Sequence, residues 1–192
     1  MCSVNTDNYM GGVQAASLLV KSGCDIVIHV NGDLSEAVLA YGRIKGFREF
    51  CESRNINHRV ILTDLGNNYE ENHIRIQKLF SELESSYKGM KIGLFMPNDT
   101  YASILLNIIV QEYGKLPDRY RIIGFDNSPV SREAIIPIST IGQQVSVMAD
   151  SAMELLTAQI NERRKRRPTP DPEPIHRIIT PILIKRETAF PE

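Results

Sequence analysis

Apolar residues along this chain occur in two kinds of run. Short uninterrupted runs are typical of strands buried on both faces, whereas apolar positions three or four residues apart are typical of amphipathic helices. The first kind predicts strands at 2–4, 26–30, 60–63, 92–96, 120–125, 138–141 and 178–184, the last as a single edge strand. The second predicts helices at about 9–21, 36–51, 70–87, 101–113 and 145–163. This alternation indicates right-handed βαβ units and therefore an α/β fold with a mostly parallel sheet.

The spacing within the helices also predicts which side chains face the core. The helix at 36–51 is expected to turn a set of five residues inward: Ala37, Ala40, Tyr41, Ile44 and Phe47. In the helix at 70–87 the apolar positions are Ile74, Ile76, Leu79, Phe80 and Leu83. Both sets are predictions about burial that a structure can test.

Polar residues follow several of the predicted strands. The apolar run at 92–96 ends in Pro97, Asn98 and Asp99, and the other strand ends carry Asn31, Asp64 and Asp126. Open parallel sheets bind ligands beyond the carboxyl ends of their strands. The sequence therefore predicts a pocket at that edge of the sheet.

Composition narrows the class of protein. The 192 residues include 22 basic and 23 acidic residues, and a net charge of −1 gives the chain no electrostatic reason to bind nucleic acid. The apolar runs are far shorter than the roughly 20 residues of a membrane span, and no charged-then-apolar signal segment opens the chain. We therefore expect a cytoplasmic protein without a membrane partner. Three cysteines, an odd number without a CxxC pair, argue against a disulfide framework.

No enzyme motif is present. The four histidines are scattered, with no metal-ligand spacing among themselves or with the cysteines. The sequence contains no GxSxG, P-loop or GxGxxG motif, and the pair Gly11-Gly12 alone is weak evidence for phosphate binding. The sequence thus predicts a binding protein that uses neither a metal nor another cofactor.

Six strings occur in a distinctive order: VNTDNYMGG (4–12), AYGRIKGF (40–47), PNDTYA (97–102), IIGFDNS (122–128), ISTIGQQ (138–144) and ITPILIKRET (179–188). Taken together, they make the chain resemble the effector-binding domain of the lactose-repressor/galactose-repressor (LacI/GalR) family of transcriptional regulators. The resemblance implies a doubly wound, periplasmic-binding-protein-like type I fold. In that fold two lobes close on a small-molecule effector, a sugar or a nucleobase.

The resemblance also implies a division into lobes. Residues 8–140 plus 166–192 would form the C-terminal lobe, and 1–7 plus 141–165 would be the crossover and a remnant of the N-terminal lobe. The chain departs from the family because most of that lobe and the DNA-binding helix-turn-helix are missing, so operator DNA would be bound only through a missing N-terminal domain. The helix at 145–163 would leave its inner face partly uncovered, and we expect weak autonomous stability or compensation by a partner chain. Relatives dimerise, so a homodimer is expected.

Carried over by their motifs, five residues are implied to contact the ligand: Asp7, Arg43, Asn98, Asp126 and Gln143. Asp126 is the strongest candidate, because a carboxylate at the end of a buried strand must be paired, with Arg43 or with a ligand donor. Tyr69 occupies roughly the place of an aromatic residue that stacks on the sugar ring in relatives.

Each of these residues has an ordinary structural interpretation as well. Asp7 is a plausible helix N-cap, and Arg43 a solvated arginine. Asn98 could be a turn residue, with Asp99 capping the helix that follows. Gln143 could be an exposed residue at a helix start, and Tyr69 is more typical of a core tyrosine.

Three functions fit the sequence. The leading hypothesis is a ligand-sensing domain without enzymatic activity, whose lobe closure changes operator affinity in an intact regulator. The alternative is a solute-binding protein for sugar transport or sensing, which shares the fold. A third hypothesis is a degenerate lobe that is kept only for dimerisation and binds no ligand.

Overall fold

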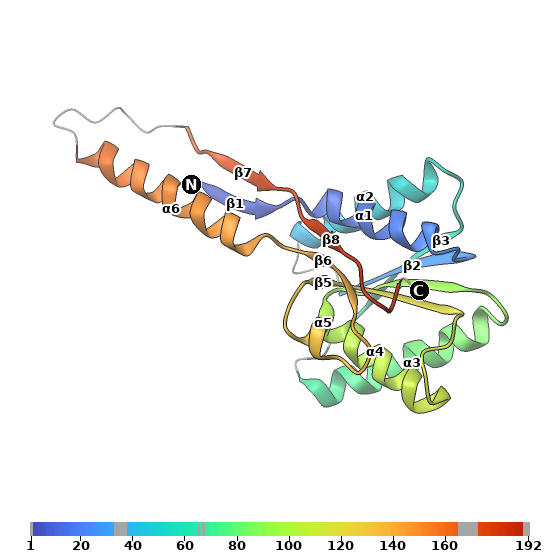
Figure 1. The fold of residues 1–192 in the computed structure, drawn as a ribbon. Coiled ribbons are helices and arrows are strands. Elements are labelled where there is room, and N and C mark those ends of the chain that lie inside the picture. Colours follow the sequence, from blue (N-terminus) through green and yellow to red (C-terminus); the bar gives the residue numbers. More distant parts are fainter. Residues whose placement is uncertain (1, 33–37, 65, 67, 165–172, 190–192) are drawn as a thin grey trace.

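A six-stranded sheet forms the centre of the molecule (Figure 1). The structure is a computed structural model that describes residues 2–32, 38–64, 66, 68–164 and 173–189. The sheet contains β2 (Ile26–Gly32), β3 (His58–Thr63), β4 (Ile92–Phe95), β5 (Tyr120–Asp126), β6 (Ser139–Gly142) and β8 (Ile182–Ile184). Their order is β3-β2-β4-β5-β6-β8, and only β8 runs antiparallel to its neighbour. The predicted α/β fold with a mostly parallel sheet is therefore confirmed.

Helices cover both faces of this sheet (Figure 1). One face carries α1 (Asn8–Lys21) and α2 (Val38–Glu52), and the other carries α3 (Tyr69–Ser86), α4 (Asp99–Tyr113) and the short α5 (Val130–Glu133), which the sequence did not predict. Each face has its own hydrophobic core. None of the helices in the described part of the chain combines the length and hydropathy that a bilayer crossing requires.

Strand β4 shows why these apolar runs form buried strands. All four of its residues are buried, with Leu94 in the core beneath α3 and α4 and Phe95 in the core beneath α1 and α2. Burying a side chain of this size contributes roughly 1.5–3 kcal/mol, so a strand that is apolar on both sides is stable only between two helical layers.

Helices α1 and α2 approach each other closely because glycine lines their contact. A Cβ atom at Gly12 would lie 2.2 Å from the carbonyl oxygen of Arg43, and one at Gly46 would lie 2.0 Å from that of Tyr9. Any larger residue would push the helices apart. This contact fixes the part of α2 that carries Arg43 against the start of α1.

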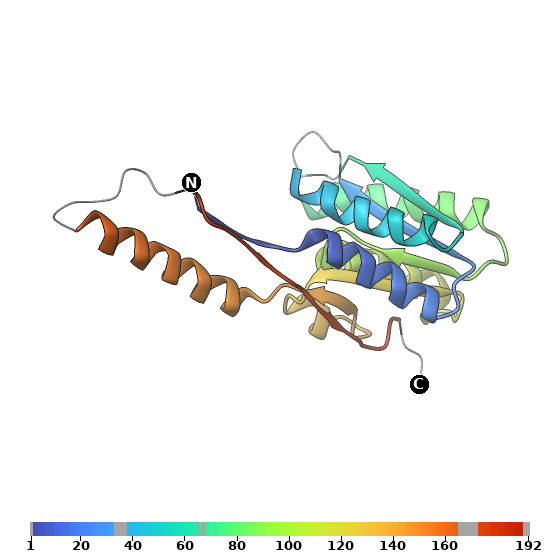
Figure 2. The ribbon, with the colours of Figure 1, turned by 90° about the horizontal axis from the view of Figure 1, so that it is seen from above.

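An extension projects from the body of the molecule (Figures 1 and 2). It consists of the parallel strands β1 (Ser3–Thr6) and β7 (His176–Ile179), together with α6 (Val145–Arg163). The prediction of one edge strand at 178–184 was wrong, because β7 pairs with β1 while β8 joins the main sheet. Thr180 and Pro181 separate the two strands, and proline cannot donate a hydrogen bond to a strand ladder.

Helix α6 exposes most of its apolar residues, as expected. Leu155 is buried, whereas the side chains of Val145, Val147, Met153, Leu156 and Ile160 are between 42% and 66% exposed. The described residues thus cover only part of its apolar surface.

Two expectations about helix packing were wrong. Tyr41 is 55% exposed although Ile44 and Phe47 on the same helix are buried, because six residues of helix rotate Tyr41 about 120° away from Phe47. Ile74 is 69% exposed, since a separation of nine positions places it on the opposite side of α3 from Leu83. Ala37 lies outside the described residues, and the side chain of Ala40 is not described.

Candidate functional site

Several candidate residues cap helices at the carboxyl edge of the sheet. Asp7 is the N-cap of α1, and its Oδ1 accepts a hydrogen bond from the backbone N–H of Met10 over 2.9 Å. Asn98 is the N-cap of α4, and its Oδ1 accepts from the N–H of Tyr101 over 3.1 Å. A cap uses one oxygen of each side chain. The other oxygen of Asp7 and the amide group of Asn98 are further hydrogen-bonding groups at this edge.

Asp99 does not cap α4, which corrects the alternative considered for it. Its side chain is 1% exposed and accepts three hydrogen bonds. Oδ2 accepts from the backbone N–H and the hydroxyl of Ser128, over 2.7 and 3.1 Å, and Oδ1 accepts from the hydroxyl of Thr140 over 2.6 Å. Burial raises the pKa of the Asp99 carboxyl, although these donors oppose the shift.

Asp126 ends β5 in an unusual backbone conformation. Its φ angle is +102°, and that of Asn127 is +56°. Such angles cost a residue with a side chain of the order of 1–3 kcal/mol and occur where the surrounding structure fixes them. Such strain is common at binding sites, which is consistent with the assignment of Asp126 as a candidate ligand-binding residue.

Gln143 connects Asp126 to the extension. Its Nε2 donates to Asp126 Oδ1 over 2.6 Å, and its Oε1 accepts from the hydroxyl of Thr6 in β1 over 2.6 Å. The side chain is half-buried, so the interpretation of Gln143 as an exposed helix-start residue was wrong. Gln143 instead bridges the last residue of β5 and the last residue of β1.

Arg43 is a half-buried residue of α2 rather than a solvated one, so that interpretation was also wrong. Its Nε donates to Asn8 Oδ1 over 2.8 Å and its Nη1 to the carbonyl oxygen of Pro97 over 2.7 Å. The guanidinium carbon lies 3.9 Å from the centre of the Phe125 ring. Burial lowers the pKa of Arg43, and the negative charge of Asp126 partly offsets this shift.

These contacts bring Arg43, Asn98 and Asp126 together. Arg43 bonds to the residue before Asn98 and stacks on the residue before Asp126. Their contact with a common ligand stays a prediction. Tyr69 begins α3 and is 56% exposed, with its ring 6.0 Å from that of His73, so the expectation of a core tyrosine was wrong.

Asn8 and Thr6 also belong to this site, although no pattern in the sequence singles them out. Asn8 holds the Nε of Arg43, and Thr6 holds Gln143. Both lie in the string VNTDNYMGG, which drew attention only to Asp7. Their partners are 35 and 137 residues away along the chain, a distance that no local pattern reveals.

His29 at the same end of the sheet is a core residue. It is fully buried in β2, and its ring stacks on that of Phe95 at 4.4 Å. Burial lowers the pKa of His29 to about 3, so the ring is neutral near pH 7. The carbonyl oxygen of Phe95, 3.1 Å from Nδ1, requires the proton to be on that nitrogen. Over the described ranges, no three His, Cys, Asp or Glu residues form a group that could hold a metal ion.

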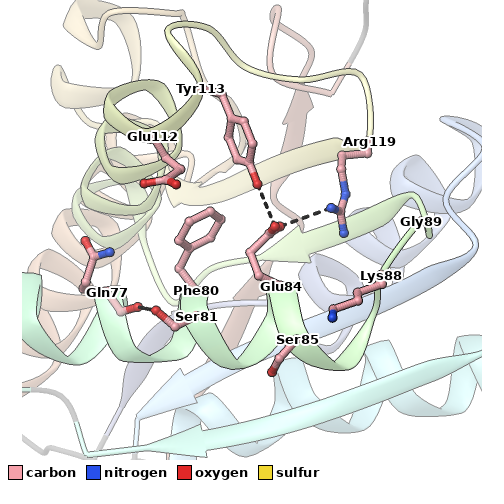
Figure 3. A pocket seen from close by; sticks show the side chains of 10 residues that line it. All are labelled: Gln77, Phe80, Ser81, Glu84, Ser85, Lys88, Gly89, Glu112, Tyr113 and Arg119. Atoms are coloured by element: carbon pink, nitrogen blue, oxygen red, sulfur yellow. Dashed lines mark hydrogen bonds and ion pairs between the residues drawn. The ribbon is translucent and has the colours of Figure 1, made fainter.

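A separate hollow of about 480 Å³ lies on the surface of α3 and α4, away from these residues (Figure 3). Glu84 accepts a hydrogen bond from the hydroxyl of Tyr113 over 2.6 Å and pairs with Arg119 at 3.3 Å. None of the six candidate ligand-binding residues lines it. Its central polar groups already bind one another, so the strand ends remain the better candidate site.

Comparison with known proteins identifies a family. The sequence model of the periplasmic binding protein-like domain matches residues 16–188. The chain is 24% identical over 161 residues to the ribose operon repressor of Halalkalibacterium halodurans, covering 83% of this chain and 46% of that protein. It is 26% identical over 171 residues to the transcriptional repressor PurR of Histophilus somni, covering 84% and 47%. The chain therefore spans about half the length of these curated relatives.

Solved structures support the same fold. A LacI transcriptional regulator from Alkaliphilus metalliredigens, complexed with D-xylulofuranose, superposes with a TM-score of 0.81 at 23% identity. The match covers 100% of this chain and 66% of that one. The predicted periplasmic-binding-protein-like fold and the resemblance to LacI/GalR regulators are both confirmed.

Proposed function

Because the chain belongs to the periplasmic binding protein-like domain family, we propose that it is the ligand-sensing part of a cytoplasmic transcriptional regulator of the LacI/GalR type. The two curated relatives described above are repressors, which supports a regulatory rather than an enzymatic role. Operator DNA would be bound by a DNA-binding domain outside these 192 residues.

The proposed effector is a sugar-like small molecule. The ribose operon repressor and the complex with D-xylulofuranose support this choice over a nucleobase. Asp126 would accept hydrogen bonds from sugar hydroxyls, whereas Arg43 and the side-chain NH2 group of Asn98 would donate to them. Asp7 and Gln143 would complete the hydrogen-bonding groups, and Tyr69 would offer an aromatic face.

The observation that carries the proposal is the position of Asp126 between Arg43 and Gln143. The positive charge of Arg43, in the body, attracts the Asp126 carboxylate. The same carboxylate is hydrogen-bonded to Gln143, which also holds Thr6 of β1 in the extension. An effector that donates to Asp126 would add hydrogen bonds to the carboxylate that Gln143 already holds. Binding would thereby favour one arrangement of the extension over another, to the extent that the effector has different affinities for the two.

The lobe division follows from the same proposal. Residues 8–140 plus 166–192 would be the C-terminal lobe, apart from β7, which pairs with β1. Residues 1–7 plus 141–165 would be the part of a second lobe present in this chain. The intact regulator is proposed to be a homodimer, as its relatives are expected to be.

A thermal-shift screen tests the proposal. The probes are D-ribose, D-xylulose, cellobiose, lactose, adenine and hypoxanthine. A probe at 100 times its dissociation constant stabilises the folded state by about 2.7 kcal/mol, so we expect one sugar to raise the melting temperature by roughly 5–10 °C. No shift with any probe would contradict a sensing role and would favour a lobe kept only for assembly.

Asp126→Ala gives the residue-specific control. The variant should fold and should show no binding of the active sugar by calorimetry. Glu84→Ala, in the separate hollow between α3 and α4, should bind it as the wild type does. Wild-type affinity in Asp126→Ala would contradict the assignment of the site.

A further inference from the structure

The turn that carries Asp126 is built from two residues in left-handed conformations, and neither is glycine. Asp126 and Asn127 have φ angles of +102° and +56°. A turn of this kind relaxes unless other groups hold it. The groups that hold it bond to the two residues that follow Asp126, namely Asn127 and Ser128.

The buried Asp99 carboxylate is the first of these groups. It accepts the backbone N–H of Ser128 over 2.7 Å, two residues beyond Asp126. It also binds the hydroxyl of Thr140, whose oxygen accepts the N–H of Asn127 over 3.3 Å. Asp99 thus holds the N–H of Ser128 directly and the N–H of Asn127 through the hydroxyl of Thr140.

The fold makes room for this carboxylate. A Cβ atom at Gly124 would lie 2.2 Å from Asp99 Oδ1 and 3.1 Å from the Cα of Asp99. Only glycine at position 124 lets Asp99 reach across β5 toward β6. Asp99, at the start of the helix that follows β4, therefore contacts both β5 and β6.

Arg186 is the second holding group. Its Nη2 donates to Asn127 Oδ1 over 2.7 Å. Its Nη1 donates to the carbonyl oxygen of Ile138 over 2.7 Å and to the hydroxyl of Ser131 over 3.2 Å. The planar guanidinium of Arg186 thus links the side chain of Asn127 to Ile138, just before β6, and to Ser131 in α5. A lysine ammonium group could not make these contacts equally well, because its donors radiate from a single nitrogen.

We propose that Asp99 and Arg186 are positioning residues, which hold the turn at Asp126 and Asn127 and thereby direct the Asp126 carboxylate toward Gln143 and the effector. Neither residue needs to touch the effector. The proposal rests on the proposed function for its biological meaning, but the positioning itself can be measured without any effector.

Magnetic resonance of the effector-free protein tests the positioning. Asp99→Asn turns one acceptor oxygen into a donor that would face the N–H of Ser128 or the hydroxyl of Thr140. Arg186→Gln removes the two-point contact with Asn127 and Ile138. We expect amide exchange at Asn127 and Ser128 to rise about tenfold in both variants, as for the loss of a hydrogen bond to a charged group.

The side-chain amide of Gln143 reports on the Asp126 carboxylate itself. In the wild type it is held by the 2.6 Å bond to Asp126, and its exchange should be slow. In both variants the exchange should approach that of a solvated glutamine. Glu84→Gln, a carboxylate-to-amide change outside this network, should leave the signal unchanged. An unchanged Gln143 signal in Asp99→Asn and Arg186→Gln would overturn the proposal.

A milder variant covers the possibility that Asp99→Asn does not fold. Thr140→Val removes one hydroxyl, which contacts both Asp99 and the N–H of Asn127, and keeps the shape of the side chain. It should release Asn127 and Gln143 in the same readout, and unaltered exchange at both would contradict the positioning role.

Calorimetry then separates this proposal from the proposed function. With the sugar that stabilises the wild type in the thermal-shift screen, Asp99→Asn should bind about tenfold more weakly, while Glu84→Gln should bind normally. If no sugar binds the wild type, the proposed function fails, and the Gln143 signal still decides the role of Asp99 and Arg186. If Asp99→Asn bound the sugar with normal affinity although the exchange of its Gln143 amide had risen, the positioning role would stand and only its link to sugar binding would be overturned.

Discussion

Gln143 donates its side-chain amide to the carboxylate of Asp126 over 2.6 Å and accepts the hydroxyl of Thr6 over 2.6 Å. This single side chain joins the last residue of β5 in the body to β1 in the extension. A mutation at Gln143 should therefore affect both parts of the molecule.

Gln143→Leu should loosen the extension. The substitution leaves Asp126 and Thr6 without this partner, and losing such half-buried bonds costs roughly 1–3 kcal/mol. Amide exchange in β1 and β7 should become faster, and urea unfolding should shift to lower denaturant. Gln77→Leu, on the exposed side of α3, is the matched control. Unchanged exchange in β1 would show that Gln143 does not hold the extension.

The α1–α2 contact predicts a large loss of stability for alanine at one glycine of α2 and almost none at another. Gly46→Ala would place a Cβ 2.0 Å from a backbone oxygen, so it should destabilise the protein by about 3 kcal/mol or more and displace Arg43. Gly42→Ala places its Cβ 3.2 Å from the Cβ of Asn8, and the better helix propensity of alanine, about 1 kcal/mol, offsets that crowding. Denaturant unfolding measures both. Equal stability of the two variants would contradict the close approach.

Arg43→Lys should weaken the site although it keeps the charge. Arg43 donates from two nitrogens to Asn8 and to Pro97, and one ammonium group cannot reach both acceptors in the same geometry. We expect a loss of about 1–2 kcal/mol in unfolding free energy and weaker binding of the active sugar. Arg54→Lys is the control, because Arg54 also lies over a phenylalanine ring, at 4.1 Å, but is exposed. A neutral result at Arg43 would mean that its planar geometry is not used.

His29 should make stability depend on pH. Its folded pKa of about 3 lies below the usual value of 6.5, so between these values the unfolded state binds more protons. The contribution of neutral His29 is complete above about pH 6.5 and is lost as the pH falls toward 3, by at most about 1.4 kcal/mol per pH unit.

His29→Phe should remove this component. The comparison is the slope of unfolding free energy against pH from 7 to 4, which should be smaller in the variant than in the wild type. His176→Phe, at an exposed position of β7, should keep the wild-type slope. Identical slopes for wild type and His29→Phe would show that His29 is not buried in its neutral form.

Local patterns predicted the elements of the body well because burial on both faces leaves a clear signal. The run at 92–96 became β4, and the helix predicted at about 9–21 became α1, Asn8–Lys21. The split between β7 and β8 was missed because both halves are apolar and alternate similarly. Which sheet each half joins depends on β1 and β6, which are distant in sequence.

The candidate site was predicted only in part, for a related reason. Asp126 and Arg43 belong to strings that stand out in the sequence, and the structure brings them together. Asp99 can be buried because Gly124 has no side chain to occupy the same space and because the hydroxyl of Thr140, 41 residues away, donates to its carboxylate. Arg186 lies in the string ITPILIKRET, but its partner Asn127 is 59 residues distant. Such contacts exist only after the strands have been assembled.

The extension is tied to the body by three very short tethers: one residue between β1 and α1, and two residues each between β6 and α6 and between β7 and β8. Backbone and side-chain bonds also fasten these tethers to one another, from Asp7 to Ile179 and from Gln144 to Thr180. Because the connections are so short, any rearrangement of the extension has to be absorbed by the backbone angles of these few residues, at a waist held to the Asp126 carboxylate through Gln143.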